Sequence, residues 1–83
     1  MKKIREVKII QALVRRLKAL RIEKDLSHNK LSVKAGITRP AISQIESGKR
    51  TPTLLVCLKI ARALDVSLGD LIQKCEKELD QKQ

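Results

Sequence analysis

Three polar residues, Arg39, Ser43 and Gln44, lie on one side of a short segment with a helical pattern, and their types suit hydrogen bonding to DNA bases. The opposite side carries Ile42 and Ile45, which indicates that it faces a core. In the major groove of a duplex, arginine can donate two hydrogen bonds to guanine, and glutamine can form two with adenine. The alternative is a polar face that meets only water, which would be the better interpretation for an isolated helix.

Groups suited to catalysis or metal binding are scarce in this chain. It has one histidine, His28, and two cysteines, Cys57 and Cys75, which are too few for a disulfide framework and show no metal-ligand spacing. No nucleophile–base pair, glycine-rich phosphate loop or carboxylate dyad is recognisable. The sequence therefore predicts no enzyme, no metal site, no cofactor and no small-molecule ligand.

The charge of the chain indicates what kind of partner it has. Its 83 residues suffice for one domain, and 19 Lys and Arg against 9 Asp and Glu give a net charge of +10. This charge favours an anionic partner, such as nucleic acid, a membrane surface or an acidic protein. Proteins that bind single strands usually stack the bases on aromatic rings, and this chain has no Phe, Trp or Tyr. Duplex DNA is therefore favoured over single strands.

The positive charge is concentrated in the first three-quarters of the chain. Residues 26–62 carry seven basic residues and one acidic residue, whereas residues 63–83 carry three Lys and five Asp or Glu. We expect the C-terminal quarter to lie away from the nucleic acid, where it would suit self-association. No apolar run approaches the roughly 18 residues of a membrane span, and the charged N-terminus does not begin a signal peptide. We therefore expect a cytoplasmic protein.

Apolar residues recur at three- and four-residue steps along the chain, which predicts an all-α fold of five helices. The first helix is predicted from about residue 4 to about residue 24. Its apolar stripe consists of Ile4, Val7, Ile10, Val14 and Leu17, with Leu13 and Leu20 beside it. A strand or loose arm over residues 2–10 is the alternative, because β-branched residues are frequent there.

Four further helices are predicted over residues 28–35, 39–47 and 54–64 and after residue 67. Each follows a hydroxyl residue that can accept hydrogen bonds from free backbone N–H groups. These caps are Ser27, Thr38, Thr53 and Ser67, the last in a capping box with Asp70. Gly36 and Gly48 are predicted to end the second and third helices. The residues of the fourth helix predicted to face inward are Leu54, Cys57, Leu58, Ala61 and Leu64.

The two helices on either side of Gly36 have the lengths and the tight turn of a helix-turn-helix, which places its second helix in a major groove. Three runs of sequence carry a family resemblance. They are Leu26-Ser27 with Leu31 and Ala35-Gly36-Ile37-Thr38, then AISQIESGKRTP over residues 41–52, then LKIARALDVSL over residues 58–68. On these residues the chain resembles the lambda-repressor/Cro-like, or XRE-type, helix-turn-helix family over about residues 13–72. The resemblance implies a five-helix bundle that binds operator DNA, commonly as a homodimer.

The resemblance assigns base reading to four residues of the third helix: Arg39, Pro40, Ser43 and Gln44. Pro40 departs from the polar residue often found at its position, because its side chain has no hydrogen-bond donor. It could touch a thymine methyl group, or it could simply stabilise the start of the helix. Both interpretations stay open.

Phosphate binding is implied for residues on both sides of the base-reading helix. They are Ser27, His28, Thr38, Lys49, Arg50 and Thr51. Contacts of this kind set the register of a protein on DNA rather than its sequence preference. The family usually carries glutamine at the position of His28. Beside a phosphate the protonated imidazole would be favoured, so DNA binding would strengthen at lower pH; a surface histidine without a role is the alternative.

Glu46 is the only acidic residue between residues 26 and 64. The resemblance pairs it with Arg21 of the first helix, which would tie that helix to the base-reading helix. The implied role is structural and not catalytic, and loss of Glu46 is expected to destabilise the fold.

A surface for dimerisation or for another protein partner is predicted in the C-terminal half of the chain. Leu55 and Val56 are apolar where the family usually has polar residues, and an apolar stripe follows on the last helix. The complete predicted surface is Leu55, Val56, Leu68, Ile72, Cys75 and Leu79. Extra core packing is the alternative, and Cys57 is expected to be a small buried apolar residue.

Residues 13–72 are thus predicted to form the DNA-binding domain. Residues 1–12 form an extension that lengthens the first helix, joins an interface, or carries Lys2, Lys3 and Arg5 towards phosphate. Residues 73–83 end the last helix and offer a possible dimer contact.

The predicted function is a sequence-specific transcriptional regulator that binds a palindromic operator in double-stranded DNA as a homodimer. The alternative is the antitoxin of a toxin–antitoxin pair, which would bind both DNA and a protein toxin. A basic helix on a membrane surface is a third interpretation, but its apolar stripe is already explained as core.

Overall fold

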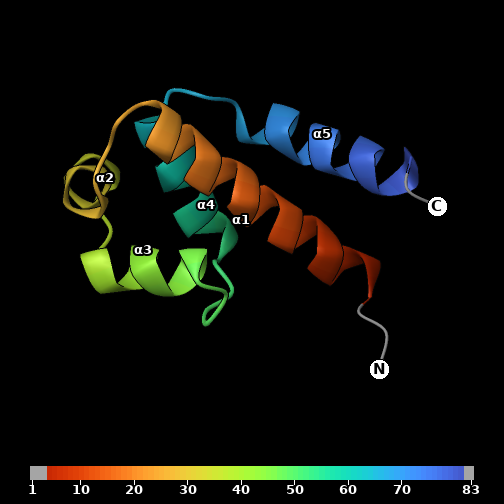
Figure 1. Cartoon of the computed structure of the whole chain (residues 1–83), viewed down its shortest axis with the longest axis horizontal. Helices are drawn as coiled ribbons and strands as arrows, with labels where there is room; N and C mark the ends of the chain where they lie inside the picture. Colours follow the sequence, from red (N-terminus) through yellow and green to blue (C-terminus); the bar gives the residue numbers. More distant parts are fainter. Residues whose placement is uncertain (1–3, 82–83) are drawn as a thin grey trace.

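The structure, a computed structural model, describes residues 4–81. Over these residues it consists of five helices without a strand (Figure 1). The helices are α1 (Arg5–Glu23), α2 (His28–Ala35), α3 (Arg39–Glu46), α4 (Leu54–Ala63) and α5 (Leu68–Gln81). The predicted all-α fold of five helices is confirmed. Because α1 begins at Arg5, a strand over residues 5–10 is excluded, whereas Lys2 and Lys3 lie outside the described residues.

The four later helices begin at the predicted capping residues. Each cap hydroxyl oxygen accepts a hydrogen bond from the backbone N–H three residues further on. The caps are Ser27 (3.1 Å), Thr38 (3.3 Å), Thr53 (3.1 Å) and Ser67 (3.2 Å). Gly36 and Gly48 adopt φ values of 70° and 83°, a left-handed conformation that glycine takes at little cost. Local sequence therefore sets both ends of the short helices.

A single hydrophobic core joins the helices and fixes the angle between α2 and α3. Leu31 of α2, Ile42 of α3 and Cys75 of α5 are each 1% exposed within it. Across the turn between α2 and α3, the hydroxyl of Ser32 donates a hydrogen bond to the carbonyl oxygen of Ile37. Burial and this hydrogen bond together hold α2 and α3 as one unit, as a helix-turn-helix requires.

The two longest helices, α1 and α5, run antiparallel along one side of the molecule, so the start of α1 lies near the end of α5 (Figure 1). Arg5 forms an ion pair with Asp80 at 2.7 Å, and Arg16 forms another with Glu78. In the structure Arg5 is thus paired within the chain. No helix among residues 4–81 has the length and apolar character needed to cross a membrane.

The predicted partner surface is wrong for two of its residues. Leu68 and Cys75 are 6% and 1% exposed and belong to the core, because α5 turns its apolar stripe towards the rest of the bundle. Ile72 and Leu79 are half-buried on the same helix. Leu55 is exposed, and Val56 is half-buried against the core.

Two of the predicted inward stripes also need correction. In α1 the predicted Leu13 and Leu17 are buried, whereas Ile4 and Val7 at the start of the predicted stripe are exposed and Ile10 and Val14 are half-buried. In α4 the core takes Cys57, Ile60, Ala61 and the following Leu64, whereas Leu54 and Leu58 are exposed. The reason is geometric in both helices: their apolar surface is wider than the strip that the core covers, so periodicity alone selects no single face.

Candidate nucleic-acid interface

Helix α3 separates its apolar and polar residues cleanly. Ala41, Ile42 and Ile45 are buried against the bundle. The four residues predicted to read bases, Arg39, Pro40, Ser43 and Gln44, are all exposed. The structure therefore brings these four residues together on the outer side of one helix, where they could enter a groove.

The start of α3 is shaped by Thr38 and Pro40. Thr38 caps the helix, and Pro40 is its second residue, where the missing N–H leaves no hydrogen bond unmade. Proline thus fits the backbone here without strain. Its ring stays exposed beside Arg39, so contact with a thymine methyl group is sterically open as well.

The basic loop after α3 is anchored to the helix itself. The carbonyl oxygen of Gln44 accepts hydrogen bonds from the backbone N–H groups of Lys49 and Arg50, at 2.9 and 3.2 Å. It also accepts one from the hydroxyl of Ser47 at 3.1 Å. Lys49, Arg50 and Thr51 are exposed. One carbonyl group therefore fixes the backbone of Lys49 and Arg50 relative to the backbone of Gln44.

Ser27 and Thr38 lie at the starts of α2 and α3, and each uses its hydroxyl oxygen as a helix cap. A hydroxyl that accepts in this way still has its own hydrogen to donate. Both residues are exposed. They can therefore cap a helix and donate to a phosphate oxygen at the same time, and the backbone N–H groups at the two helix starts favour an anion there.

The predicted ion pair between Arg21 and Glu46 is present and has bidentate geometry. Arg21 Nε lies 2.7 Å from Glu46 Oε2, and Nη2 lies 2.9 Å from Oε1. The remaining Nη1 donates to the carbonyl oxygen of Leu26 at 2.7 Å. The two charged side chains are only 12% and 10% exposed. This arrangement joins α1, the chain leading to α2, and the end of α3.

His28 also contacts this ion pair, which the sequence did not predict. Its Nε2 lies 3.1 Å from Glu46 Oε1, and its side chain remains 28% exposed. Burial acts to raise the pKa of the Glu46 carboxyl, but hydrogen bonds from Arg21 and His28 outweigh it, so this pKa lies below its ordinary value. Eighteen residues separate His28 from Glu46, and no sequence periodicity signals a contact over that distance.

The two cysteines are structural. Cys57 is buried as expected, and burial raises the pKa of both the Cys57 and the Cys75 thiols, which keeps them protonated. Among residues 4–81 there is no group of three His, Cys, Asp or Glu side chains that could hold a metal ion.

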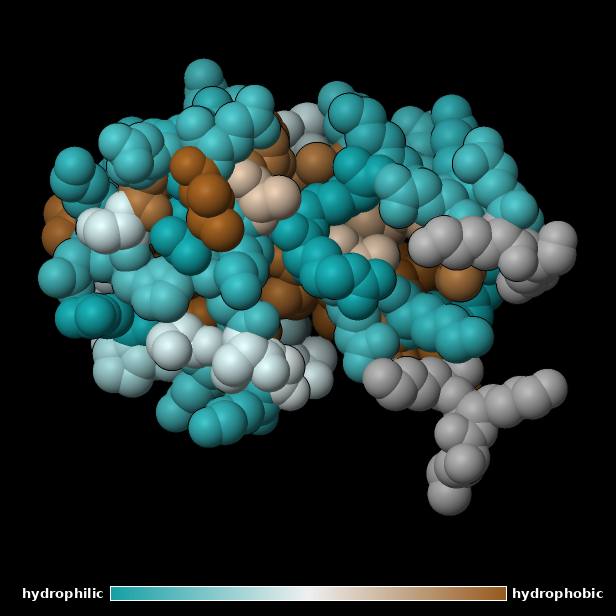
Figure 2. All heavy atoms as spheres, in the orientation of Figure 1, coloured by the Kyte–Doolittle hydropathy of each residue, from teal (hydrophilic) through white to brown (hydrophobic). Residues whose placement is uncertain are grey.

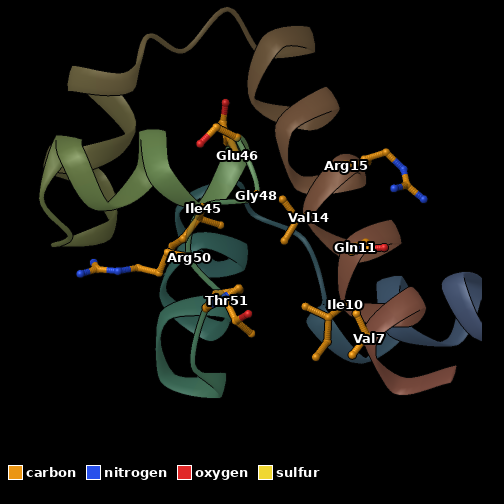
Figure 3. Close-up of a pocket in the computed structure, with 12 residues that line it drawn as sticks. Val7, Ile10, Gln11, Val14, Arg15, Ile45, Glu46, Gly48, Arg50 and Thr51 are labelled. Atoms are coloured by element: carbon orange, nitrogen blue, oxygen red, sulfur yellow. The ribbon is translucent and has the colours of Figure 1, made fainter. Parts of the chain in front are cut away.

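A groove with a mixed apolar and polar lining lies beside the end of α3, between the N-terminal half of α1 and the loop from α3 to α4 (Figure 3). Its volume is about 350 Å³. Val7, Ile10 and Val14 form its α1 side, and Ile45 and Thr51 lie opposite. This groove, hereafter the α1 groove, was not predicted, because its α1 residues were assigned to the core.

Comparison with known proteins also identifies a helix-turn-helix in this chain. The helix-turn-helix family model HTH_3 matches residues 17–71. The HTH-type transcriptional regulator YqaE of Bacillus subtilis is 40% identical over 57 residues, which are 69% of this chain and 49% of YqaE. The chain thus spans about half the length of this relative.

Two solved structures of restriction-modification controller proteins are also similar. C.AhdI from Aeromonas hydrophila matches with a TM-score of 0.69 and 32% identity, over 78% of this chain and 97% of C.AhdI. A point mutant of C.Esp1396I matches with a TM-score of 0.78 and 27% identity, over 90% of this chain and 97% of that protein. The fold, the exposed polar face of α3 and the family match agree. The chain belongs to the lambda-repressor/Cro-like, or XRE-type, helix-turn-helix family of DNA-binding transcriptional regulators, which are not enzymes.

Proposed function

We propose that this protein is a homodimeric transcriptional regulator that reads a palindromic operator in double-stranded DNA through α3. One observation carries the proposal: the exposed row of Arg39, Ser43 and Gln44 is fixed by a shared carbonyl to the basic loop at Lys49 and Arg50. Base-reading and phosphate-binding groups thus approach a duplex together. In a homodimer the two α3 helices enter successive major grooves, with the half-site centres about 34 Å apart.

In this proposal the residues divide into two roles. Arg39 and Gln44 select bases, Ser43 adds a hydroxyl that can donate or accept, and Pro40 adds apolar contact. Phosphate contacts come from the residues around them and position the helix without selecting sequence. Those residues are Ser27, His28, Thr38, Lys49, Arg50 and Thr51.

The likeness to two restriction-modification controller proteins supports a small transcriptional regulator rather than an antitoxin. We propose that the protein acts in the cytoplasm, with DNA and a second copy of itself as its partners. A test with a direct readout is competition: unlabelled duplex should displace a labelled duplex far better than single-stranded DNA of the same sequence. Equal competition by the single strand would overturn the assignment to duplex DNA.

Replacing Arg50 with alanine should weaken binding to every duplex by a similar factor, because a phosphate contact carries no sequence information. The slope of log K against log salt should fall in magnitude by about 1, since one fewer counterion is released. Fluorescence anisotropy at several salt concentrations measures both quantities. If Arg50→Ala instead changed which sequence is preferred, the loop would be reading bases.

A further inference from the structure

The α1 groove combines apolar walls with basic residues beside them. Val7, Ile10 and Val14 of α1 form one wall, and Ile45 of α3 lies opposite (Figure 3). Val7 is exposed, and Ile10 and Val14 are half-buried, so the fold leaves part of this stripe in contact with water. Figure 2 shows apolar side chains recessed between hydrophilic ones near the centre of the visible face. Exposed apolar area of this kind typically marks a contact surface.

The basic residues around the groove are not neutralised by the chain. Arg15 and Arg50 line the groove, and Lys18 lines a small hollow that opens beside it and shares part of its lining. None of these three cations forms an ion pair with a residue of the range 4–81. The acidic residue in the lining, Glu46, is already held by Arg21. The groove therefore offers positive charge that an acidic partner could neutralise.

The shape of the groove suits a helix. The side chain of Arg15 extends outward from α1, and the guanidinium of Arg50 points away from α1 (Figure 3), so neither covers the apolar walls. Val7 and Lys18 are eleven residues apart along α1, which is about 16 Å or three helical turns. A helix about 10–12 Å across with its side chains can lie along this length and still reach Arg15 at the side.

We propose that the α1 groove binds an acidic amphipathic helix of another protein. Apolar side chains at positions i, i+3 or i+4, and i+7 of that helix contact Val7, Ile10 and Val14. Its carboxylates lie beside Arg15 and Lys18. Burial of apolar surface supplies affinity, and the opposite charges select and orient the partner. The inference adds a protein partner to the proposed function and does not depend on DNA binding or on a homodimer.

Two other occupants match the groove less well. A nucleic acid would pair its phosphates with Arg15 and Lys18, but it would leave the apolar wall of α1 without a matching surface. A second copy of the chain offers, within residues 4–81, no acidic helix with an exposed apolar stripe. The acidic residues of α5 accompany a stripe whose Leu68 and Cys75 are buried.

A helix in the groove leaves the proposed DNA surface free. The groove borders the C-terminal end of α3, whereas Arg39 and Pro40 lie at its N-terminal end. The guanidinium of Arg50, which points away from α1, also stays available to a phosphate (Figure 3). The protein can therefore hold DNA and the acidic helix at the same time.

The first test is selection of ligands for the full-length protein from a displayed library of random helical peptides. Peptides of about 15 residues form about four helical turns and cover the groove. The enriched peptides should carry apolar residues at helical spacing on one side, with Asp or Glu beside them. Failure to enrich any peptide, or enrichment of peptides without acidic residues, would overturn the inference.

The second test measures the dissociation constant of the most enriched peptide by fluorescence anisotropy. Val7→Glu and Arg15→Glu should each weaken binding at least about tenfold, because each sets a carboxylate against an acidic helix. Val33→Glu and Lys77→Glu are the matched controls, since they make the same types of change at exposed positions outside the groove. Solvent screens these distant charges, so both controls should bind within about threefold of the wild type. Equal losses in variants and controls would show that net charge alone attracts the peptide, which would refute the groove.

Both groove variants are expected to fold, and circular dichroism checks this. Val7 is the third residue of α1, where an acidic side chain favours the helix dipole, and Arg15 is exposed. Duplex DNA tests the other anionic occupant. If Arg15→Glu weakened duplex binding about as much as peptide binding while Lys77→Glu did not, the stripe would contact phosphate and the inference would fail. A protein that binds the peptide in its groove but selects no DNA sequence would refute only the proposed function.

Discussion

Replacing both Arg39 and Gln44 with alanine is expected to remove most of the discrimination between the operator and other duplexes. A bidentate contact to a base contributes about 1–3 kcal/mol of discrimination, so loss of two such contacts should lower the specificity ratio by about 100-fold or more. Both side chains are exposed on the outer face of α3, and neither has a role in the core. The folded structure should therefore be preserved.

The measurement is the dissociation constant for the operator and for a scrambled duplex, each at about 150 mM salt to weaken nonspecific binding. Gln44→Ala is the cleaner single variant, because it changes no charge. Arg50→Ala serves as the matched control for Arg39→Ala, since it removes the same charge from the neighbouring loop. If the operator and scrambled duplexes lost affinity equally in Gln44→Ala, this residue would not read bases.

Replacing Glu46 with alanine is expected to destabilise the fold strongly. It leaves Arg21, which is 12% exposed, without its bidentate partner, and breaking a buried pair in this way costs about 3–5 kcal/mol. For a domain of this size each kcal/mol lowers Tm by about 4–8 °C. Thermal unfolding followed by circular dichroism should therefore show a Tm lower by more than about 10 °C.

The matched control for Glu46→Ala is Asp80→Ala, which removes the acidic partner of the exposed Arg5. Solvent screens that pair, so Tm should stay close to the wild-type value. An equal fall in Tm for both variants would mean that burial of the Glu46 pair confers no special stability. Glu46→Gln should lie between the wild type and Glu46→Ala, because the amide oxygen can still accept one of the hydrogen bonds from Arg21.

The Glu46 carboxylate also predicts how the stability of the fold changes as the pH is lowered. The pKa of Glu46 is lowered in the folded state below its ordinary value of 4.5. The contribution of this carboxylate to the free energy of unfolding is therefore complete above pH 4.5. It is lost as the pH falls through the folded-state pKa. The difference in Tm between the wild type and Glu46→Gln should therefore shrink as the pH is lowered from 6 to 3. A difference that stays constant over this range would contradict the assignment.

Local sequence signals predicted the parts of the fold that depend on local chemistry. Ser27 and Thr38 cap helices because a hydroxyl oxygen reaches a backbone N–H three residues away, and Gly36 ends a helix because it adopts a positive φ. These interactions involve residues within one turn of one another. The exposed face of α3 was equally predictable, because Ile42 and Ile45 leave only the opposite side for polar residues.

Features that depend on distant parts of the chain were predicted less well. Leu58 is as apolar as any core residue of α4, and only the position of the neighbouring helices decides that it is exposed. Cys75 was assigned to a surface because nothing in α5 alone indicates that α1 covers it. The contact of His28 with Glu46 likewise exists only after α2 and α3 have packed together. In each example the burial or the contact depends on how two helices pack together, and the sequence of one helix alone does not determine it.

The most direct test of sequence-specific recognition is selection of duplex DNA from a random pool by the wild-type protein at about 150 mM salt, where phosphate binding alone is weakened. We expect enrichment of a palindrome whose two half-sites are centred about 10 base pairs apart, because two α3 helices then meet successive major grooves. Parallel selection with the Arg39→Ala/Gln44→Ala variant should lose that enrichment. A pool that remains random with the folded wild-type protein would contradict sequence-specific recognition through α3.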